Sequence, residues 1–325
     1  MKKDAFIKLA EIQIGETVSR PVLVSGFSEN VSRNGKPFLR VNLRDGFSEQ
    51  TAMLFDSTVS TLSALGIGKD TVADVSLSVT EFQGGKSYKI NEIHPCSDPS
   101  LTLNDFTKLP PVDLDLMYGE ICELLESAAD TQDGKYTSLS ELTLNILADH
   151  KKNFMSSSAA ISMHHALRGG LLYHTYRMVK TADVICNVYT DLDRELLLCG
   201  TALHDIGKIW EYNTSPSGEA EFTSSGVLFG HAYMGASLIK KYTADLKCNK
   251  EKVQLLIHLI LSHHGTLEWG AVTCPAIPEA LALHYIDNLD AKMYMFEEQY
   301  ETLQPGELSD KKPFGLDNKV YMPKI

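Results

Sequence analysis

The sequence predicts two domains of different class, a small β-barrel followed by an all-α helical bundle. Residues 1–95 hold short apolar or alternating runs separated by Asn-Gly, Asp-Gly and Gly-Gly, a pattern typical of strands joined by tight turns. From Asp115 onward, apolar residues recur at helical spacing, for example at Ile121, Leu124, Leu125 and Ala128. A chain of 325 residues is long enough for two separate hydrophobic cores.

The N-terminal part is expected to be an OB-like barrel. Strands are expected over residues 18–27, 36–43, 50–55, 72–82 and 87–93. A short helix is expected over residues 58–65, between the third and fourth strands. Five strands with a helix in this place are typical of an OB-type fold, with another small β-barrel or a sandwich as the alternative.

The pattern along the chain also gives domain boundaries. We expect an OB-like nucleic-acid-binding domain over residues 1–95, a Pro- and Ser-containing linker over 96–112, a helical domain over 113–303, and an irregular tail over 304–325. Within the helical domain, helices are expected over residues 138–149, 155–166, 170–189, 194–210, 231–242, 250–262 and 277–300.

Charge and cysteine content limit the partners and the compartment. The net charge is −12, yet residues 1–98 hold 11 Lys and Arg against 12 Asp and Glu, so the acidity lies almost wholly in the helical part. A nucleic-acid partner is therefore not excluded, although divalent cations would be needed to screen phosphates. The six cysteines show no C-x-x-C spacing, which favours free thiols in the cytoplasm. No apolar run approaches the roughly 20 residues that cross a bilayer, and the first residues do not resemble a signal peptide.

Ten of the eleven histidines lie from His150 onward, and an adjacent pair, His204 and Asp205, stands among them. Nitrogen and oxygen ligands without cysteine suit Mn, Fe, Co, Ni or Zn in a catalytic site. With Lys208, the pair is expected on one helix spanning 194–210. Asp205 is expected to bridge two ions, one held by His174, His204 and Asp287 and the other by Asp205, His231 and His263. The remaining helical-domain histidines are interpreted as surface or core residues, with a role proposed only for His264.

The motifs around these residues resemble those of a known superfamily. The stretches are residues 170–174 (GLLYH), 203–208 (LHDIGK), 261–265 (LSHHG) with 268–270 (EWG), and 284–293 (HYIDNLDAKM). They resemble the H…HD…D signature of the HD superfamily of metal-dependent phosphohydrolases, at His174, His204-Asp205 and Asp287. With the OB-like domain, they resemble the YhaM family of 3′→5′ exoribonucleases.

That resemblance implies hydrolysis of phosphodiester bonds in single-stranded RNA, with single-stranded DNA as an alternative substrate. It implies two divalent ions, Mn²⁺ before Fe, Co, Ni or Zn, which would activate a water and neutralise charge on the phosphate. Lys208 would contact a non-bridging phosphate oxygen, and His264 would contact the phosphate or protonate the leaving oxygen. A homo-oligomer is compatible with the sequence, and no membrane partner is expected.

The expected RNA-binding surface of the barrel contains Arg33, Lys36, Phe38 and Arg40. Phe38 and Arg40 would share an outer face, where aromatic rings stack on bases and cations follow the phosphate backbone. Alternatively, Phe38 belongs to the barrel core and the arginines only increase solubility.

Three other functions are weighed against exoribonuclease activity. A phosphohydrolase of small or cyclic nucleotides would leave the barrel without a role. A dimetal oxygenase would need iron and O₂, and a nucleic-acid-binding adaptor would have lost metal ligands that are present in this sequence.

Overall fold

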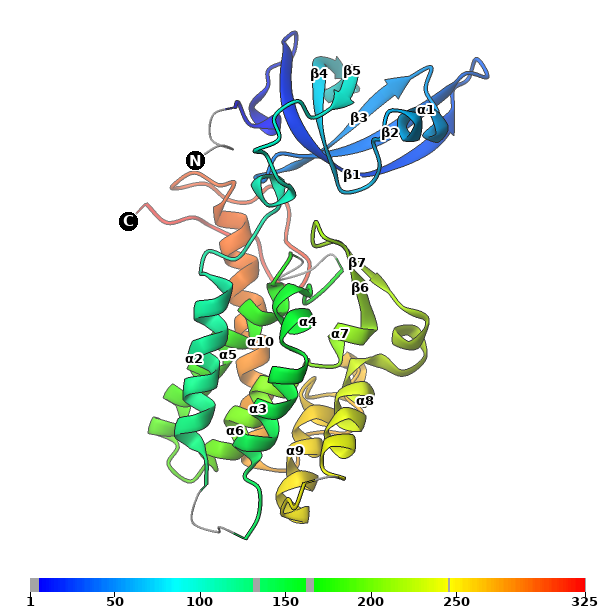
Figure 1. Cartoon of the computed structure of the whole chain (residues 1–325). Helices are drawn as coiled ribbons and strands as arrows, with labels where there is room; N and C mark the ends of the chain where they lie inside the picture. Colours follow the sequence, from blue (N-terminus) through cyan, green and yellow to red (C-terminus); the bar gives the residue numbers. More distant parts are fainter. Residues whose placement is uncertain (1–5, 131–134, 162–166, 245, 325) are drawn as a thin grey trace. The chain divides into compact units, whose positions relative to one another are not determined.

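The computed structural model of the protein describes residues 6–130, 135–161, 167–244 and 246–324. The chain divides into two compact units, one of residues Met1–Leu109 with Ser215–Gly218 and one of Pro110–Thr214 with Glu219–Ile325. In Figure 1 the first unit, in blue and cyan, consists mainly of strands, whereas the second, in green to red, consists mainly of helices. Among the described residues, no helix combines the length and apolar character needed to cross a membrane.

The first unit is a closed five-stranded barrel, which confirms the predicted fold class. Its strands are β1 Thr17–Val31, β2 Pro37–Arg44, β3 Glu49–Phe55, β4 Thr71–Phe82 and β5 Gly85–Pro95, with the helix α1 Val59–Ala64 between β3 and β4. The strand order is β1-β2-β3-β5-β4, and β3 runs parallel to β5 while the other pairs are antiparallel. This order and the position of α1 define an OB-type barrel.

Alternation along β2 separates the barrel core from its outer face. Leu39, Val41 and Leu43 are fully buried in the barrel core. Arg40, between two of them, is exposed, and Phe38 on the same outer face is half-buried. Successive side chains of a strand point to opposite faces, so Phe38 lies on the same face as Arg40 and not among the core residues of β2.

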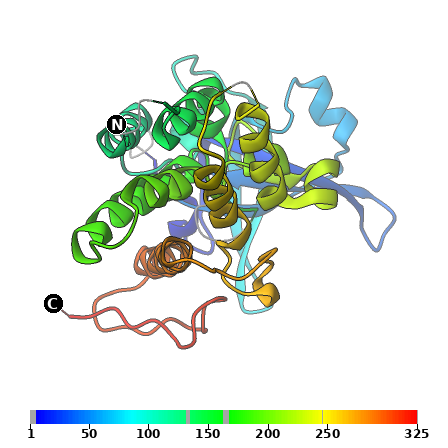
Figure 2. The same ribbon diagram turned by 90° about the horizontal axis from the view of Figure 1, so that it is seen from below.

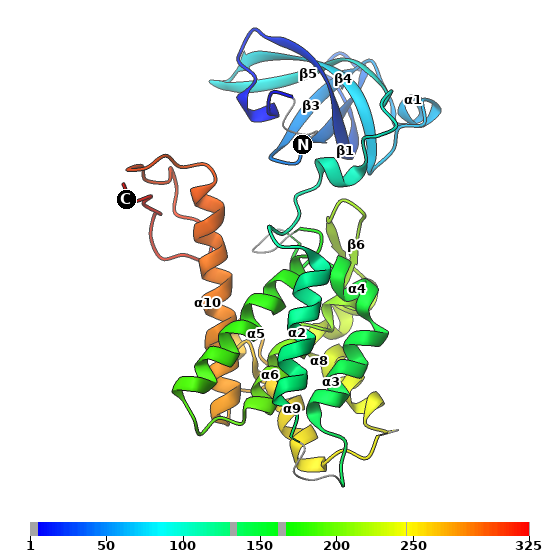
Figure 3. The same cartoon turned by 60° about the vertical axis from the view of Figure 1, so that its left-hand side comes forward.

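The second unit is built around α5, which packs against α2, α6 and α10. The helices are α2 Leu114–Ala128, α3 Leu139–Asp149, α4 Lys151–Ser156, α5 Gly170–Val188, α6 Arg194–Leu203, α7 Lys208–Glu211, α8 Ser224–Tyr242, α9 Lys250–Ser262 and α10 Pro278–Tyr300. Figure 3 shows α2, α3 and α5 lying beside one another as long rods, with α10 on one side of α5. Their buried aliphatic residues form one continuous core.

The prediction of a helix over residues 155–166 is wrong for most of the residues that the structure describes in this range. The helix α4 ends at Ser156, residues 157–161 are not helical, and residues 162–166 lie outside the described residues. Serine side chains bond to the backbone here: the Ser156 hydroxyl donates to the Lys152 carbonyl at 2.9 Å, and the Ser158 hydroxyl to that of Ala160 at 2.7 Å. Such local bonds compete with continuation of the helix.

The single helix predicted over residues 194–210 is also wrong. The helix α6 ends at Leu203, a tight turn follows, and the four-residue helix α7 begins at Lys208. In the turn the Ile206 amide donates to the Leu203 carbonyl and the Lys208 amide to the Asp205 carbonyl, so each bond spans only three residues. His204 and Asp205 are thus placed on a turn rather than inside a helix.

The prediction that this domain contains only helices missed a short hairpin. It consists of β6 Tyr212–Thr214 and β7 Ala220–Phe222, which pair antiparallel. Gly218, with a φ of 89°, lies in the connecting turn, a conformation that glycine adopts without strain.

The segment predicted as an irregular tail has a defined fold beside α10. Its backbone pairs with itself through hydrogen bonds from Gly306 to Met322 and from Ser309 to Val320, at 2.7 and 2.8 Å between nitrogen and oxygen. Leu316 and Val320 are buried. Figure 2 shows this segment, in red, lying next to α10, so the chain after α10 adds to the folded unit.

Candidate metal centre

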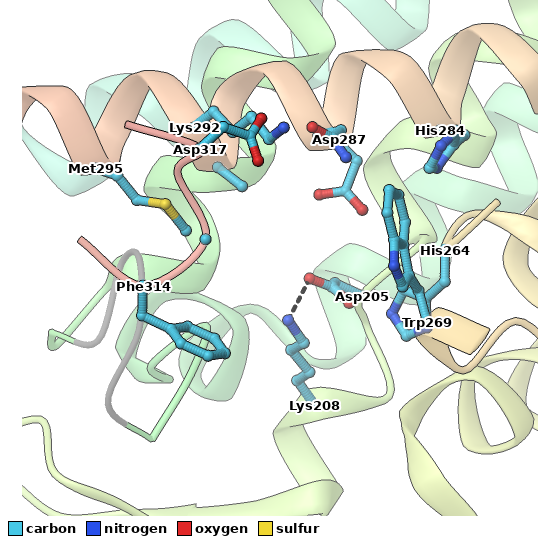
Figure 4. A pocket seen from close by; sticks show the side chains of 13 residues that line it. Asp205, Lys208, His264, Trp269, His284, Asp287, Lys292, Met295, Phe314 and Asp317 are labelled. Carbon is cyan, nitrogen blue, oxygen red and sulfur yellow. Dashed lines mark ion pairs between the residues drawn. The ribbon is translucent and has the colours of Figure 1, made fainter. Parts of the chain in front are cut away.

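The six expected metal ligands come together from five places in the second unit. His174 lies on α5, His204 and Asp205 follow α6, His231 follows a break in α8, His263 follows α9, and Asp287 lies within α10. Figure 4 shows Asp205 and Asp287 directing their carboxylates into the same space.

The first group consists of His174, His204 and Asp287, whose ligand atoms lie within 4.8 Å of one another. The His174 Nε2 atom is 3.3 Å from Asp287 Oδ1. Asp205 Oδ2 lies 3.2 Å from His204 Nε2 and 3.9 Å from His174 Nε2. This geometry could hold one ion with a contribution from Asp205.

The second group consists of His231, His263 and His264, again with ligand atoms within 4.8 Å of one another. Here the other oxygen of Asp205, Oδ1, lies 3.4 Å from His231 Nε2 and 3.8 Å from His263 Nε2. One carboxylate therefore faces both groups, one oxygen to each. His264, which is expected to contact the phosphate or protonate the leaving oxygen, also lies close enough to be a ligand.

Four of these histidines have the same hydrogen-bonding arrangement. Their Nδ1 atoms lie 2.7–2.9 Å from an acceptor: Asp290 for His174, the Thr201 carbonyl for His204, Glu211 for His231 and the Ile260 carbonyl for His263. A proton on Nδ1 satisfies each of these acceptors and leaves the Nε2 lone pair directed at the centre. This is the usual arrangement of metal-binding histidines.

The unpaired atoms at the centre also fit a metal ion. Among the described residues, His204 Nε2 and Asp205 Oδ1 are buried and have no hydrogen-bond partner. Buried polar atoms are rarely left in this state, because losing their water costs free energy that nothing repays. Two such atoms, each facing one of the groups, are what a cation would satisfy.

The electrostatics of the centre favour ionised carboxylates. Burial raises the pKa of Asp205, but Lys208 and His204 outweigh burial and hold that pKa well below its usual range. Burial likewise raises the pKa of Asp287, and the hydrogen bond from His174 more than reverses this effect. Burial and the neighbouring His264 lower the pKa of His263, so this imidazole is neutral and able to coordinate.

His174 has the opposite electrostatic environment. Burial lowers its pKa, but Asp287 and Asp290 outweigh burial and raise it to about 9. Between two carboxylates, the imidazole carries protons on both nitrogens at neutral pH in the absence of a cation, and it is therefore positively charged. A metal ion at His174 Nε2 would take the place of the proton on that nitrogen.

Two glycines allow His231 to approach Asp205. Gly230 has φ 70° and ψ 156° and interrupts α8 immediately before His231. A Cβ atom added to Gly207 would lie 2.0 Å from the His231 carbonyl oxygen. The turn after Asp205 and the backbone of α8 can therefore come this close only because residue 207 has no side chain.

Sequence reasoning missed the residues that orient the histidines. Asp290 accepts from His174 and also pairs with Arg177, whose Nε lies 2.6 Å from Asp290 Oδ1. Glu211 binds both the backbone amide and the ring of His231, at 3.0 and 2.9 Å. Asp290 lies one helical turn after Asp287 on α10, a spacing that could have indicated it. No comparable sequence signal marked Glu211, since its contact with His231 depends on the break after α6.

The expected catalytic residues lie at the same centre. Lys208 Nζ is 2.7 Å from Asp205 Oδ2, and this ion pair is drawn in Figure 4. His264 is half-buried beside His263, with ring centroids 4.1 Å apart.

The expected RNA-binding residues lie in the first unit. Arg33 and Lys36 are exposed in the turn before β2, and Lys36 pairs with Asp56 at 3.2 Å. Phe38 contacts Phe55 on β3, with ring centroids 5.8 Å apart. Arg40 is exposed on the same face of β2 as Phe38.

The fold and the site define a class of protein, in which an OB-type barrel is joined to a helical domain with a candidate metal centre of histidines and aspartates. The HD domain family matches residues 171–292, which include every expected metal ligand.

The 3′-5′ exoribonuclease YhaM of Bacillus subtilis is 33% identical to this chain over 310 residues, which cover 95% of each protein. The chain belongs to the YhaM family, which confirms the resemblance seen in the motifs. A solved structure, the second OB-fold domain of replication protein A from Methanococcus maripaludis, is 18% identical. The match covers 29% of this chain and 97% of that one, with a TM-score of 0.23.

Proposed function

We propose that this protein is a metal-dependent 3′→5′ exoribonuclease that hydrolyses single-stranded RNA. The observation that carries the proposal is Asp205, a buried carboxylate with one oxygen toward each histidine group. The relative in Bacillus subtilis bears the same activity in its name and matches the chain almost from end to end.

The two groups would hold two divalent cations. We infer Mn²⁺ as the resident ion, with Fe, Co, Ni and Zn as alternatives that suit the same nitrogen and oxygen ligands. His174, His204 and Asp287 would hold one ion, His231 and His263 the other, and Asp205 both. When bound, such a pair lowers the pKa of a water molecule and offsets negative charge on the phosphate.

The other polar side chains at the centre have roles that do not require ligation. We assign Lys208 to a non-bridging oxygen of the scissile phosphate, because its ammonium group already lies beside a carboxylate oxygen at the centre. We assign His264 to the phosphate or to the leaving oxygen, which it would protonate. Its Nδ1 is buried and has no partner among the described residues. Because His264 lies close to His231, binding of a metal ion is a second role for this residue.

The barrel would bind the strand upstream of its 3′ end. Phe38 and Phe55 offer neighbouring rings on which bases could stack, while Arg33, Lys36 and Arg40 would contact phosphates. The alternative that Phe38 is a core residue is less favoured, because its strand neighbours Leu39 and Val41 fill the core instead.

The finer properties of the protein are proposals of the same kind. Single-stranded DNA would be a second substrate, and the chain would act as a homo-oligomer in the cytoplasm. Support for the compartment comes from the cysteines: the described structure contains free cysteines, and the buried Cys199 has its pKa raised to about 12 by burial, which keeps it unreactive.

The activity is tested with a single-stranded RNA labelled at its 5′ end, incubated with the protein and Mn²⁺. Stepwise shortening to a ladder of 5′-labelled fragments is expected, because a 3′→5′ enzyme removes nucleotides from the unlabelled end. Removing the metal with a chelator should abolish the shortening, and adding Mn²⁺ back should restore it.

A cyclic dinucleotide incubated in parallel separates this function from that of a small-nucleotide phosphohydrolase. Rapid hydrolysis of the dinucleotide with intact RNA would overturn the proposal. Release of the 5′ label as a mononucleotide in the first turnover would show the opposite polarity.

The role of the barrel is tested with Phe38→Ala. We expect roughly tenfold weaker binding of a long single-stranded RNA, since stacking of one base contributes about 1–3 kcal/mol. Phe47→Ala, an exposed aromatic residue beyond the other end of β2, is the matched control. Fluorescence anisotropy measures both affinities, and equal affinities for the two variants would exclude the proposed surface.

A further inference from the structure

A cavity of about 640 Å³ opens beside the candidate metal centre, entirely within the second unit. Asp205 and Asp287 lie on its wall, and two aromatic rings, Trp269 and Phe314, also line it. In Figure 4 the two rings lie on opposite sides of the opening, with the carboxylates between them. The volume is within the range of pockets that bind small ligands and cofactors.

Both rings are exposed. Trp269 is 60% exposed and Phe314 is 83% exposed. Large aromatic side chains contribute much more to stability when buried, so exposed rings at the mouth of a pocket that is also lined by charged side chains indicate a binding role. Neither ring has been used in the metal centre.

Trp269 is held by a tight turn rather than by a flexible loop. It ends the 3₁₀ helix Leu267–Trp269, and Gly270 follows with a φ of 93°. The amide of Ala271 returns to the Thr266 carbonyl at 3.1 Å and closes the turn. The indole ring lies 5.8 Å from the ring of His284, whose Nδ1 bonds to the His263 carbonyl at 2.9 Å. Through His284, Trp269 is thereby connected to the backbone of His263, one of the expected metal ligands.

Phe314 is held by the segment after α10. The next residue, Gly315, has a φ of 89°, and a Cβ atom there would lie 2.7 Å from Cε of Met295 on α10. Leu316 is buried, which fixes the chain immediately after the ring. The backbone pairing of Ser309 with Val320 closes the loop that carries Phe314.

The pocket also offers groups for the phosphate and sugar. Lys208 and Lys292 line it, as does Asn288. A pocket with two aromatic rings, two ammonium groups and a metal centre matches the parts of one nucleotide: a flat base, a hydroxylated sugar and an anionic phosphate.

We propose that this pocket binds the 3′-terminal nucleotide of the strand, with its base held between Trp269 and Phe314. The inference rests on the proposed exoribonuclease function and deepens it. Stacking on aromatic faces tolerates any base, so the pocket would position the terminal phosphodiester at the metal centre without selecting sequence. The segment 304–325 would then be part of the substrate site.

Fluorescence tests the pocket independently of catalysis. The chain has two tryptophans, so Trp210→Phe leaves Trp269 as the single indole. Adding AMP, the expected type of product, to this metal-loaded variant should quench its fluorescence, because a stacked base contacts the indole directly. Ribose 5-phosphate, which lacks a base, should not. Adding Phe314→Ala should raise the Kd for AMP by roughly fivefold or more, the lower end of one base-stacking contribution.

Leu308→Ala is the matched control, since Leu308 is an exposed apolar residue of the same segment outside this pocket. It should leave the Kd for AMP unchanged. Equal quenching by AMP and ribose 5-phosphate, or an unchanged Kd in the Phe314→Ala protein, would overturn the proposal. RNA shortening is measured in parallel: its absence with normal AMP binding rejects the exoribonuclease function, whereas shortening without AMP quenching rejects only the pocket.

Discussion

Asp205→Asn is expected to lower kcat for RNA hydrolysis by roughly a thousandfold or more, corresponding to about 4 kcal/mol of lost metal-ion stabilisation. A neutral amide offers one oxygen in place of two charged ones and cannot face both histidine groups as a ligand. The substitution also leaves Lys208, 2.7 Å away, without its carboxylate partner. Metal content, measured by mass spectrometry of the purified protein, should fall together with kcat.

Asp191→Asn is the matched control, because Asp191 is an exposed carboxylate in the loop between α5 and α6. It should keep both full activity and full metal content. If Asp205→Asn retained two ions per chain and most of its kcat, the bridging role of Asp205 would be wrong.

Gly207→Ala is expected to disrupt the centre without changing any ligand. The added methyl group would lie 2.0 Å from the His231 carbonyl oxygen and 2.7 Å from its carbonyl carbon, so the turn or α8 must move. Overpacking of this kind costs about 1–3 kcal/mol, and here it displaces His231 from Asp205. Thermal denaturation should show a lower Tm, and the metal content should fall with the second group most affected.

Gly119→Ala provides a sharp comparison, since Gly119 lies inside α2 and an added Cβ atom there meets nothing within 4 Å. This substitution should raise stability by up to about 1 kcal/mol, because alanine is the better helix former. A Gly207→Ala protein as stable and as rich in metal as the Gly119→Ala protein would contradict the packing argument.

Most of the fold could be predicted from the sequence because its signals are local. The alternation in β2 places Leu39 and Val41 in the core and Arg40 outside it, as the structure confirms. The spacing of apolar residues gave α5, α9 and α10 to within one residue at each end. Residue chemistry alone brought His174, His204 and Asp287 into one expected ligand group, and the structure brings these side chains together. Their binding of a metal remains a prediction.

The failures involve features that depend on contacts distant in sequence. At the break between α6 and α7, the backbone of α8 lies close to Gly207, a contact that no local pattern reveals. Glu211 orients His231 only because that break turns α7 toward α8. The segment after α10 has no helix or strand among its described residues, and its backbone pairs across a loop, for example Ser309 with Val320, where the sequence shows little hydrophobic periodicity.

The hydrogen-bond partners of the histidines have a further consequence, which concerns the total charge of the centre. The carboxylates that contact the histidines are Asp205, Asp287, Asp290 and Glu211, and the cations paired with them are Lys208 and Arg177. Without metal, and with His174 protonated, these groups leave an excess of about one negative charge, which repels a phosphate. Two divalent ions, which would also displace the extra proton of His174, would make the net charge of the centre positive. One phosphodiester and one hydroxide together would neutralise this positive charge. Loading with metal would therefore convert the centre from a barrier to RNA into an anion receptor.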